Sequence, residues 1–100
     1  MYTIEEKRNR ILIKVLEDRW NYVGYLKYRI KKHDKNTKYV YIDLISVEDL
    51  YRNQGYATAM VDYLYKKYTP DLCIEVEHMT PMGYMFFTNI KDYYPMMVLK

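Results

Sequence analysis

Apolar and polar side chains alternate along much of the first half of the chain, a pattern typical of β-strands. Ile11 to Leu16 is a largely β-branched apolar run, and Tyr22 to Ile30 carries apolar or small residues on one parity and Lys27 and Arg29 on the other. The polar, turn-like cluster Glu17 to Asn21 lies between them. The two runs therefore predict a β-hairpin whose second strand exposes one face to water.

A third apolar run, from Tyr39 to Val47, follows a loop from Lys31 to Lys38 that contains no apolar residue. Apolar side chains occupy both parities of this run, as in a strand that is buried on both faces. We therefore expect it to lie at the centre of the sheet. An alternating run from Leu72 to Glu77 and the tail from Pro95 to Leu99 predict two more strands.

A segment after the third run has the spacing of a helix. Apolar residues recur three, four, seven, eight and eleven positions after Ala57 and form one stripe over about four turns; they are Met60, Val61, Leu64, Tyr65 and Tyr68. Asp62 and Lys66 form an i,i+4 pair outside this stripe. Pro70 ends the predicted helix.

Thr80 followed by Pro81 predicts the start of a second helix, which extends to about Ile90. The first helix connects the Tyr39 to Val47 strand with the Leu72 to Glu77 strand, so these two strands should be parallel neighbours. The predicted fold class is α/β (α+β), with a mixed central sheet of antiparallel hairpin strands followed by a parallel β-α-β unit. Residues 1–100 form a single domain with two main helices.

Composition adds limits on the partners of this domain. Half of the 100 residues are hydrophobic and 17% are aromatic, which suffices for a core. The net charge of +3 and the isoelectric point near 8.8 stay below the basic footprint of nucleic-acid-binding domains, whose isoelectric points exceed about 9. This charge is compatible with an anionic small ligand, and we expect no nucleic-acid partner.

A single cysteine, Cys73, excludes an internal disulfide and shows no metal-ligand spacing. No apolar run approaches the roughly 20 residues of a membrane helix. The segment from Met1 to Arg10 is too polar for a signal peptide. We therefore expect a cytoplasmic protein without a metal site.

The segment V-E-D-L-Y-R-N-Q-G-Y-A-T, from Val47 to Thr58, connects the predicted central strand to the first helix. Free N–H groups at a helix start can bind phosphate, and small residues such as Gly55 and Ala57 leave room for it. The alternative is an ordinary helix start in which Gly55 merely eases the turn.

This segment resembles the acetyl-CoA pyrophosphate loop of the GCN5-related N-acetyltransferases (GNAT), written V-x-P-x-x-[RQ]-x-x-G-x-[GA]. Asp49 replaces the common proline, and the matching residues are Val47, Arg52, Gly55 and Ala57. The order of elements from about Ile11 to Leu99 also resembles this family. The two helices that usually precede the hairpin, and that normally help to wall the acceptor site, are missing from the predicted pattern.

The resemblance implies acetyl-CoA as the cofactor. Thr80 stands where the family tends to have an asparagine that contacts CoA, although it also suits a plain helix cap. The pantetheine arm would pair with the backbone of Ile45, Ser46 and Val47. The pyrophosphate would lie in the loop at Arg52, against the amides of Asn53, Gln54, Gly55, Tyr56, Ala57 and Thr58.

Acetyl transfer to an amine requires a group that removes a proton from the amine. Glu75 occupies the place of the general-base glutamate in bacterial ribosomal-protein N-terminal acetyltransferases, which makes it the first candidate. The alternative is that Glu75 is solvated and inert, on the wet parity of its strand with Cys73 and Glu77. Asp43, the lone carboxylate of the predicted central strand, is the second candidate; its alternative is an ion pair with a lysine or arginine of the hairpin.

Phe87 stands where the family commonly has the tyrosine that protonates the departing CoA thiolate. Tyr84, one turn earlier, could supply a hydroxyl, and a thiolate can also leave without a dedicated acid. His78 follows the predicted parallel strand and is a further catalytic candidate, or else an exposed loop histidine. We expect His33, in the charged loop, to be solvated, and Cys73 to be a half-buried residue without a catalytic role.

Two functions follow from these observations. The first is an N-acetyltransferase that moves an acetyl group from acetyl-CoA to a primary amine, on a protein lysine, an N-terminus or a small molecule, by direct attack. The second is a catalytically weak or inactive protein of the same fold that docks on a macromolecular partner, as the tyrosine-rich surface and Phe87 suggest. The loop lysines Lys31, Lys32, Lys35 and Lys38 are then either solvated or a patch for an acidic partner. An open sheet edge also suggests a homodimer.

Overall fold

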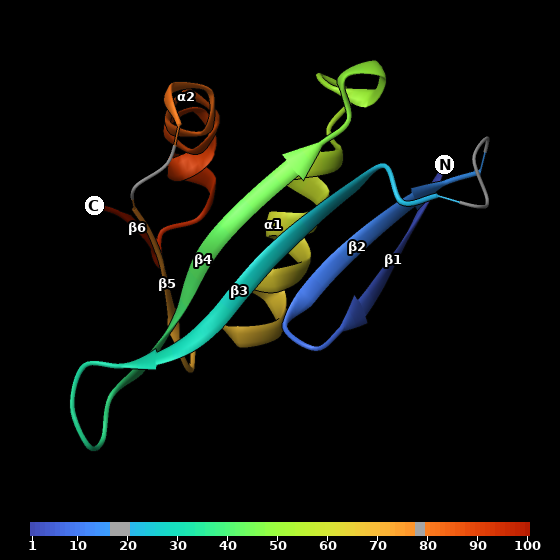
Figure 1. Cartoon of the computed structure of the whole chain (residues 1–100). Coiled ribbons are helices and arrows are strands. Elements are labelled where there is room, and N and C mark those ends of the chain that lie inside the picture. Colours follow the sequence, from blue (N-terminus) through green and yellow to red (C-terminus); the bar gives the residue numbers. More distant parts are fainter. Residues whose placement is uncertain (17–20, 78–79) are drawn as a thin grey trace.

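The computed structural model of the chain describes residues 1–16, 21–77 and 80–100. The strands form one mixed sheet in the order β1-β2-β3-β4-β5-β6 (Figure 1). Its elements are β1 (Tyr2–Lys7), β2 (Arg10–Val15), β3 (Gly24–Lys32), β4 (Lys38–Val47), the short 3-10 helix η1 (Asp49–Tyr51), α1 (Tyr56–Tyr68), β5 (Cys73–Val76), α2 (Pro81–Ile90), the 3-10 helix η2 (Lys91–Tyr93) and β6 (Met97–Leu99).

Each neighbouring pair of strands from β1 to β4 is antiparallel, whereas β5 is parallel to both of its neighbours, β4 and β6. This arrangement confirms the predicted mixed sheet, its parallel β-α-β unit and its two helices. The turn predicted at Glu17 to Asn21 lies outside the described residues except for Asn21. Neither α-helix in the described chain has the length and apolar character needed to span a lipid bilayer.

Strand β1 is the one strand that the hydrophobic pattern did not predict. It pairs antiparallel with β2, from Tyr2 opposite Val15 to Lys7 opposite Arg10. The turn between them places Arg8 and Asn9 at φ 43° and 64°, as in a tight two-residue hairpin turn. β1 lies at the sheet edge with most of its side chains exposed, so its residues lack the alternation that marks a half-buried strand.

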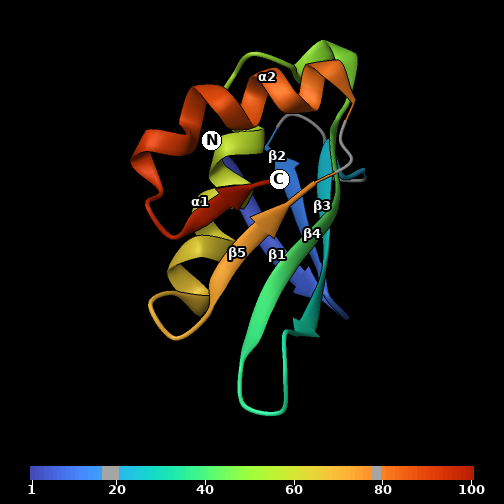
Figure 2. The same ribbon diagram turned by 90° about the vertical axis from the view of Figure 1, so that its left-hand side faces the viewer.

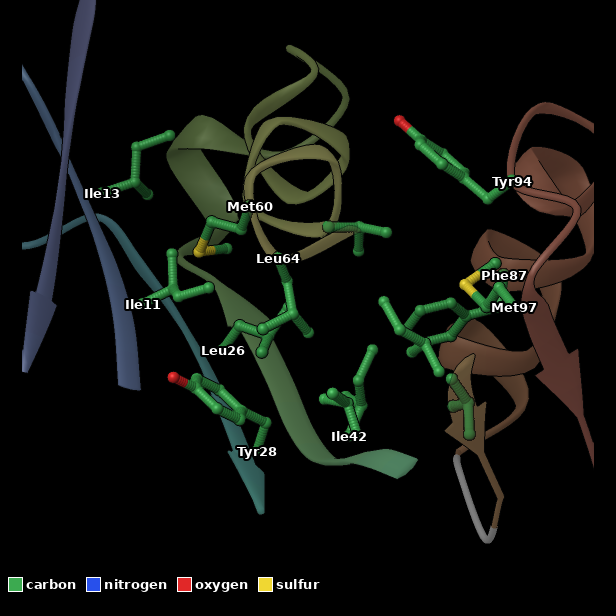
Figure 3. Packing of buried hydrophobic residues seen from close by; sticks show 14 of the residues in the cluster. Ile11, Ile13, Leu26, Tyr28, Ile42, Met60, Leu64, Phe87, Tyr94 and Met97 are labelled. Atoms are coloured by element: carbon green, nitrogen blue, oxygen red, sulfur yellow. The ribbon is translucent and has the colours of Figure 1, made fainter. Parts of the chain in front are cut away.

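The core lies between one face of the sheet and both helices. Figure 2 shows α1 and α2 on the same side of the sheet, as two right-handed crossovers between neighbouring parallel strands require. Leu64 of α1 and Phe87 of α2 are 0% and 1% exposed and belong to one cluster with strand residues such as Leu26 (Figure 3). The predicted stripe of α1 is confirmed at Met60, Val61 and Leu64, its buried residues.

A β-bulge in β4 determines where the central strands separate. In the pairing of β3 with β4, Lys27 lies opposite Leu44 and Tyr28 opposite Ile42, which leaves Asp43 as the extra residue. A bulge of this kind bends its strand and increases the local twist. The pairing of β4 with β5 ends at Ile42 opposite Val76, one residue before the bulge. The last residues of β4 therefore diverge from β5. The backbone edge of β4 that faces away from β3 has no pairing with β5 there.

The sheet face opposite the helices carries no helix within the described part of the chain. Tyr41, on this face, is 8% exposed because Arg29 and Lys31 lie over its ring, with the Lys31 Nζ 3.8 Å from the centroid. Leu44, beyond the bulge, is 47% exposed. The prediction of a strand buried on both faces is therefore correct for the middle of β4 and wrong for its end, where the bulge directs Leu44 to solvent.

Tyr94 provides a test of the packing between α1 and the C-terminal segment. Its hydroxyl donates to the Asp62 carboxylate at 3.2 Å, and its ring packs against Tyr65 with the centroids 4.9 Å apart. Burial, with the Asp62 charge beside it, raises the pKa of Tyr94 to about 12 from 10.0. Because the folded-state pKa lies above the unfolded one, the associated stability is complete below pH 10 and disappears as the pH rises to about 12.

We expect Tyr94→Phe to flatten the decrease in unfolding free energy above pH 10 by up to about 3 kcal/mol, since the pKa of Tyr94 is raised to about 12 from 10.0. Urea unfolding at a series of pH values measures this slope. Burial also raises the pKa of Tyr28, so part of the slope remains in the variant. The control is Tyr93→Phe, since Tyr93 is 79% exposed; equal slopes in the two variants would contradict the assignment.

Candidate functional site

A cleft of about 660 Å³ lies at the carboxyl end of β4, between η1, the start of α1 and one side of α2. Figure 1 shows this end of β4 between α2 and the loop that leads into α1. The loop contributes polar groups, and α2 contributes apolar ones, mainly Met82, Met85 and Phe86. A concave site with an apolar wall and a few polar groups at one end is the usual form of a small-molecule site.

The loop before α1 turns through two residues with left-handed backbone conformations, Asn53 at φ 61° and Gly55 at φ 86°. Glycine adopts this conformation without the steric conflict of a Cβ atom. A Cβ atom built on Gly55 would meet nothing within 4 Å, so the surroundings leave space there. The requirement for glycine is therefore a matter of backbone conformation, and the space beside it remains open to a ligand.

Arg52 holds the two ends of this loop together. Its Nε donates to the carbonyl oxygen of Val47 at 3.0 Å, and its Nη2 lies 2.9 Å from the Asp49 carboxylate. Asp49 is the residue that replaces the proline of the family pattern. The replacement of this proline by Asp49 therefore comes with an ion pair to Arg52 that supports the same loop.

The start of α1 presents free backbone amides to the cleft. The amides of Tyr56, Ala57 and Thr58 precede the first i→i−4 bond of the helix, which runs from the Ala59 amide to the Gly55 carbonyl. Gly55 caps the helix without a side-chain hydrogen bond, and the first turn contains no acidic residue. The positive end of the helix dipole is therefore not neutralised from within the first turn, which favours an anion at this point.

The end of β4 contributes a second set of backbone groups. Ile45, Ser46 and Val47 pair with β3 on one side, and on the other side the pairing with β5 has already ended. The edge turned away from β3 borders the cleft, because all three residues line it. An extended ligand could bind this edge as an additional strand would.

The structure brings nearly all of the predicted cofactor-binding residues to this cleft. Those that line it are Ile45, Ser46, Val47, Arg52, Asn53, Gly55, Tyr56, Ala57, Thr58 and Thr80. Gln54 lies outside the lining, with its amide donating to the Leu50 carbonyl oxygen at 3.3 Å. Thr80 caps α2, since its Oγ1 accepts from the Gly83 amide at 3.1 Å. Both interpretations of Thr80, a helix cap and a residue of the cleft, are thus compatible.

Glu75 lies on the helix-free face of the sheet, next to the point where β4 and β5 separate. Its pairing partner in β4 is Tyr41, one residue before the final pair of the two strands. The side chain is only 6% exposed and lies 2.6 Å from the Nζ of Lys100 and 2.8 Å from the Nε2 of His33. The hydrogen bond with Glu75 raises the pKa of Lys100.

One alternative weighed from the sequence is therefore wrong. Glu75 is not solvated on a wet strand face, because Lys100 and His33 cover it. His33 is exposed, as predicted, and it also stacks on Tyr39 with the ring centroids 4.1 Å apart. The pattern in the sequence could not show either contact, because both partners come from elsewhere in the chain. Cys73 is half-buried, as expected.

Asp43, the second candidate base, is engaged by Arg29. The guanidinium Nε donates to the two carboxylate oxygens at 3.0 and 2.8 Å, and Nη2 donates at 2.7 Å. The ion pair with a hairpin arginine is therefore confirmed. Asp43 does not line the cleft, and a catalytic role for it stays a prediction.

The candidate acid Tyr84 is 57% exposed and lies outside the cleft lining. Phe87 is 1% exposed and packs in the core, so the two residues do not share one face of α2 toward the cleft. His78 lies outside the described residues. The sequence reasoning also missed the apolar wall of Met82, Met85 and Phe86 on α2; their helical spacing after Thr80 was the signal that could have shown it.

Comparison with known families agrees with this geometry. The model of the Acetyltransferase (GNAT) family matches residues 2–80. The chain therefore belongs to the GNAT acetyltransferase family. The match starts at the first residue of β1, earlier than the resemblance from Ile11 suggested. No α-helix precedes α1 in the described ranges, as the pattern of the sequence predicted.

Solved structures show the same fold at low identity. An aminoglycoside acetyltransferase from an uncultured soil metagenomic sample aligns with a TM-score of 0.68 and 18% identity, over 81% of this chain and 56% of that one. The Brucella melitensis ribosomal-protein-alanine N-acetyltransferase aligns with a TM-score of 0.64 and 20% identity, over 81% of this chain and 61% of that one. A NatB acetyltransferase complex bound to CoA and MES aligns with a TM-score of 0.68 and 17% identity, over 82% of this chain and 56% of that one.

The present chain thus spans little more than half of the length of these proteins. No protein of curated function matches the sequence.

The left-handed conformation of Gly55 can be tested separately from any ligand. We expect Gly55→Ala to lower the unfolding free energy by roughly 1–2 kcal/mol, the cost of a Cβ atom in a left-handed conformation. Because nothing lies within 4 Å of that Cβ, no clash adds to this cost. Chemical denaturation measures it. An unchanged or increased stability would show that the loop does not require glycine.

Proposed function

We propose that this protein is an N-acetyltransferase that transfers the acetyl group of acetyl-CoA to a primary amine. One observation supports the proposal above all. The unpaired edge at the end of β4 and the uncapped amides at the start of α1 border the same cleft. The strand edge suits the pantetheine arm of CoA, and the amides suit its pyrophosphate.

The pyrophosphate would lie against the amides of Tyr56, Ala57 and Thr58, where the helix dipole favours negative charge. Arg52 lines this end of the cleft with its side chain 46% exposed and its charge paired with Asp49. The pantetheine arm would extend along Ile45 to Val47 and hydrogen-bond to the free edge of β4. This orientation directs the thioester toward the point where β4 and β5 separate.

Acetyl-CoA supplies an activated acyl group, and the amine nitrogen attacks its carbonyl carbon while the CoA thiolate leaves. Glu75, beside the separation of the two strands, is our candidate for accepting the proton of the amine. His33 contacts the same carboxylate at 2.8 Å, and its side chain is 42% exposed. The imidazole therefore offers the proton a route from the buried carboxylate to solvent.

The leaving thiolate receives no proton from the position of the usual tyrosine, because Phe87 is buried in the core. The exposed Tyr84 remains a candidate acid only if it turns toward the cleft. A thiolate is an acceptable leaving group near neutral pH, so the reaction does not depend on a protein acid. We propose that departure from this site occurs without one.

The acceptor would approach from the helix-free face of the sheet, where Glu75 lies. No described helix walls this face, so it can admit an amine on a large molecule. The structural neighbours include one ribosomal-protein-alanine N-acetyltransferase and a NatC complex bound to a Gag peptide and CoA. We therefore propose an amine of a protein or peptide as the acceptor class, ahead of a small amine.

Calorimetry with acetyl-CoA and the variant Gly55→Glu tests the cofactor site. A carboxylate at this position places a negative charge in the anion site, and we expect the dissociation constant to rise more than tenfold, since about 1.4 kcal/mol already corresponds to tenfold. Gly55→Ala is the matched control because it has the same backbone strain without the charge. Equal affinities of the two variants would place acetyl-CoA elsewhere.

The variant Glu75→Gln tests the base. We expect kcat to fall by about 100-fold or more, within the usual contribution of general-base catalysis, while the affinity for acetyl-CoA stays unchanged. The partners Lys100 and His33 are both partly exposed and can be rehydrated in the variant. Acetyl transfer to a set of peptide amines gives the rate, and Glu77→Gln, one residue beyond the end of β5, is the control. Full activity of Glu75→Gln would exclude this role.

A second candidate function is a protein that keeps the fold and docks on a macromolecule. The exposed side chains of Tyr25, Leu44 and Tyr84 favour it, because aromatic and apolar residues are common in interfaces. Binding of acetyl-CoA without turnover on any amine would support this alternative over the enzyme.

A further inference from the structure

Three side chains of different chemistry converge on the helix-free face, outside the acetyl-CoA cleft. They are His33, Cys73 and Glu75, whose ligand atoms all lie within 4.8 Å of one another. No spacing in the sequence links them, since one comes from the loop after β3 and two come from β5. We propose that this trio is a binding site for a divalent transition-metal ion of the zinc class.

The fold holds each of the three residues in place. Cys73 and Glu75 are two positions apart on β5, so their side chains leave the same face of the strand. The backbone amide of His33 donates to the Thr37 carbonyl oxygen at 2.8 Å, which closes the loop on which the imidazole sits. The ring itself stacks on Tyr39, the residue opposite Cys73 in the pairing of β4 with β5.

The Glu75 carboxylate is already oriented for a single bond to a metal. Lys100 holds Oε1 at 2.6 Å, and Oε2 faces the Nε2 of His33 at 2.8 Å. An ion that binds between them replaces the proton shared by Oε2 and Nε2, and it also displaces the thiol proton of Cys73. Lys100 then acts as the outer partner that fixes the carboxylate, a contact found beside most ligating carboxylates.

The donor set determines the class of ion. Imidazole nitrogen, thiolate sulfur and one carboxylate oxygen suit zinc and its neighbours, whereas magnesium and calcium require oxygen ligands. Bonds of about 2.0 to 2.3 Å in a tetrahedron place ligand atoms roughly 3.5 Å apart, so small rotations about side-chain bonds suffice from the present separations. Three protein ligands leave the fourth position to water.

One consequence rests on the proposed function. A metal bound to Glu75 removes this carboxylate from proton transfer, so zinc would inhibit acetylation at the site. Metal binding itself is measured without turnover. Its failure would therefore leave the proposed acetyltransferase intact, and loss of the acetyltransferase would leave the metal site intact.

Titration of the reduced protein with Co²⁺, followed by absorption spectroscopy, tests the proposal. We expect one equivalent to produce a thiolate-to-cobalt charge-transfer band together with the strong visible bands of a tetrahedral ion, and one equivalent of Zn²⁺ to abolish both. Absence of these bands at stoichiometric Co²⁺, or failure of Zn²⁺ to displace it, would overturn the site.

Single variants distinguish the trio from binding by the thiol alone. We expect Cys73→Ser to abolish the charge-transfer band. Removal of an outer partner weakens metal binding by up to about 100-fold. Because His33 and Glu75 are direct ligands, we expect His33→Gln and Glu75→Gln each to weaken Zn²⁺ binding by at least that factor. Lys100→Met should weaken it about tenfold. Glu77→Gln, which changes a carboxylate just beyond the end of β5 and outside the trio, is the control with unchanged affinity.

Circular dichroism shows that each variant is folded. Unchanged affinity in His33→Gln and Glu75→Gln would show adventitious binding by the cysteine and would overturn the proposal.

Discussion

The early end of the pairing between β4 and β5 is the constraint on which the rest of the structure depends. The two strands share backbone hydrogen bonds only as far as Ile42 and Val76, and the bulge at Asp43 follows at once. Since a bulge bends its strand, the remaining residues of β4 turn away and their outer edge stays free. The cleft, the position of Glu75 and the exposure of Leu44 all follow from this separation.

The bulge has its own support. Asp43 accepts three hydrogen bonds from Arg29 of the neighbouring strand, so the extra residue is held on the helix-free face by a bidentate ion pair. Arg52 performs a similar task at the other end of the cleft, where it joins the last carbonyl of β4 to Asp49. Two arginines thus stabilise the irregular backbone at both ends of the site. Neither of them needs to contact a ligand to do so.

Burial on the helix-free face comes from charged and aromatic side chains. Glu75 loses its hydration but gains Lys100 and His33, which offset the desolvation of its charge. Tyr41 is similarly covered by Arg29 and Lys31. This face is therefore ordered by ion pairs and cation–π contacts, and it can present a buried carboxylate to a ligand without a covering helix.

The pattern of the sequence was informative wherever a residue's environment depends on its own element. The stripe of α1, the Thr80 and Pro81 start of α2, the one-sided burial of β3 and the V-x-x-x-x-R-x-x-G-x-A loop all reflect local periodicity or backbone conformation. The same reasoning failed for β1, because an edge strand with most of its side chains exposed has little alternation to detect. It also could not place the bulge, which depends on the register between two strands.

The sequence by itself determined the elements, their order and the small-residue loop, since hydrophobic periodicity and glycine conformation are properties of neighbouring residues. Only the tertiary structure decided which of those residues meet. Lys100 reaches Glu75 because β6 lies beside β5, and His33 reaches it because the loop between β3 and β4 folds over Tyr39. Contacts between residues far apart in the chain depend on register and strand order, and no local pattern contains that information.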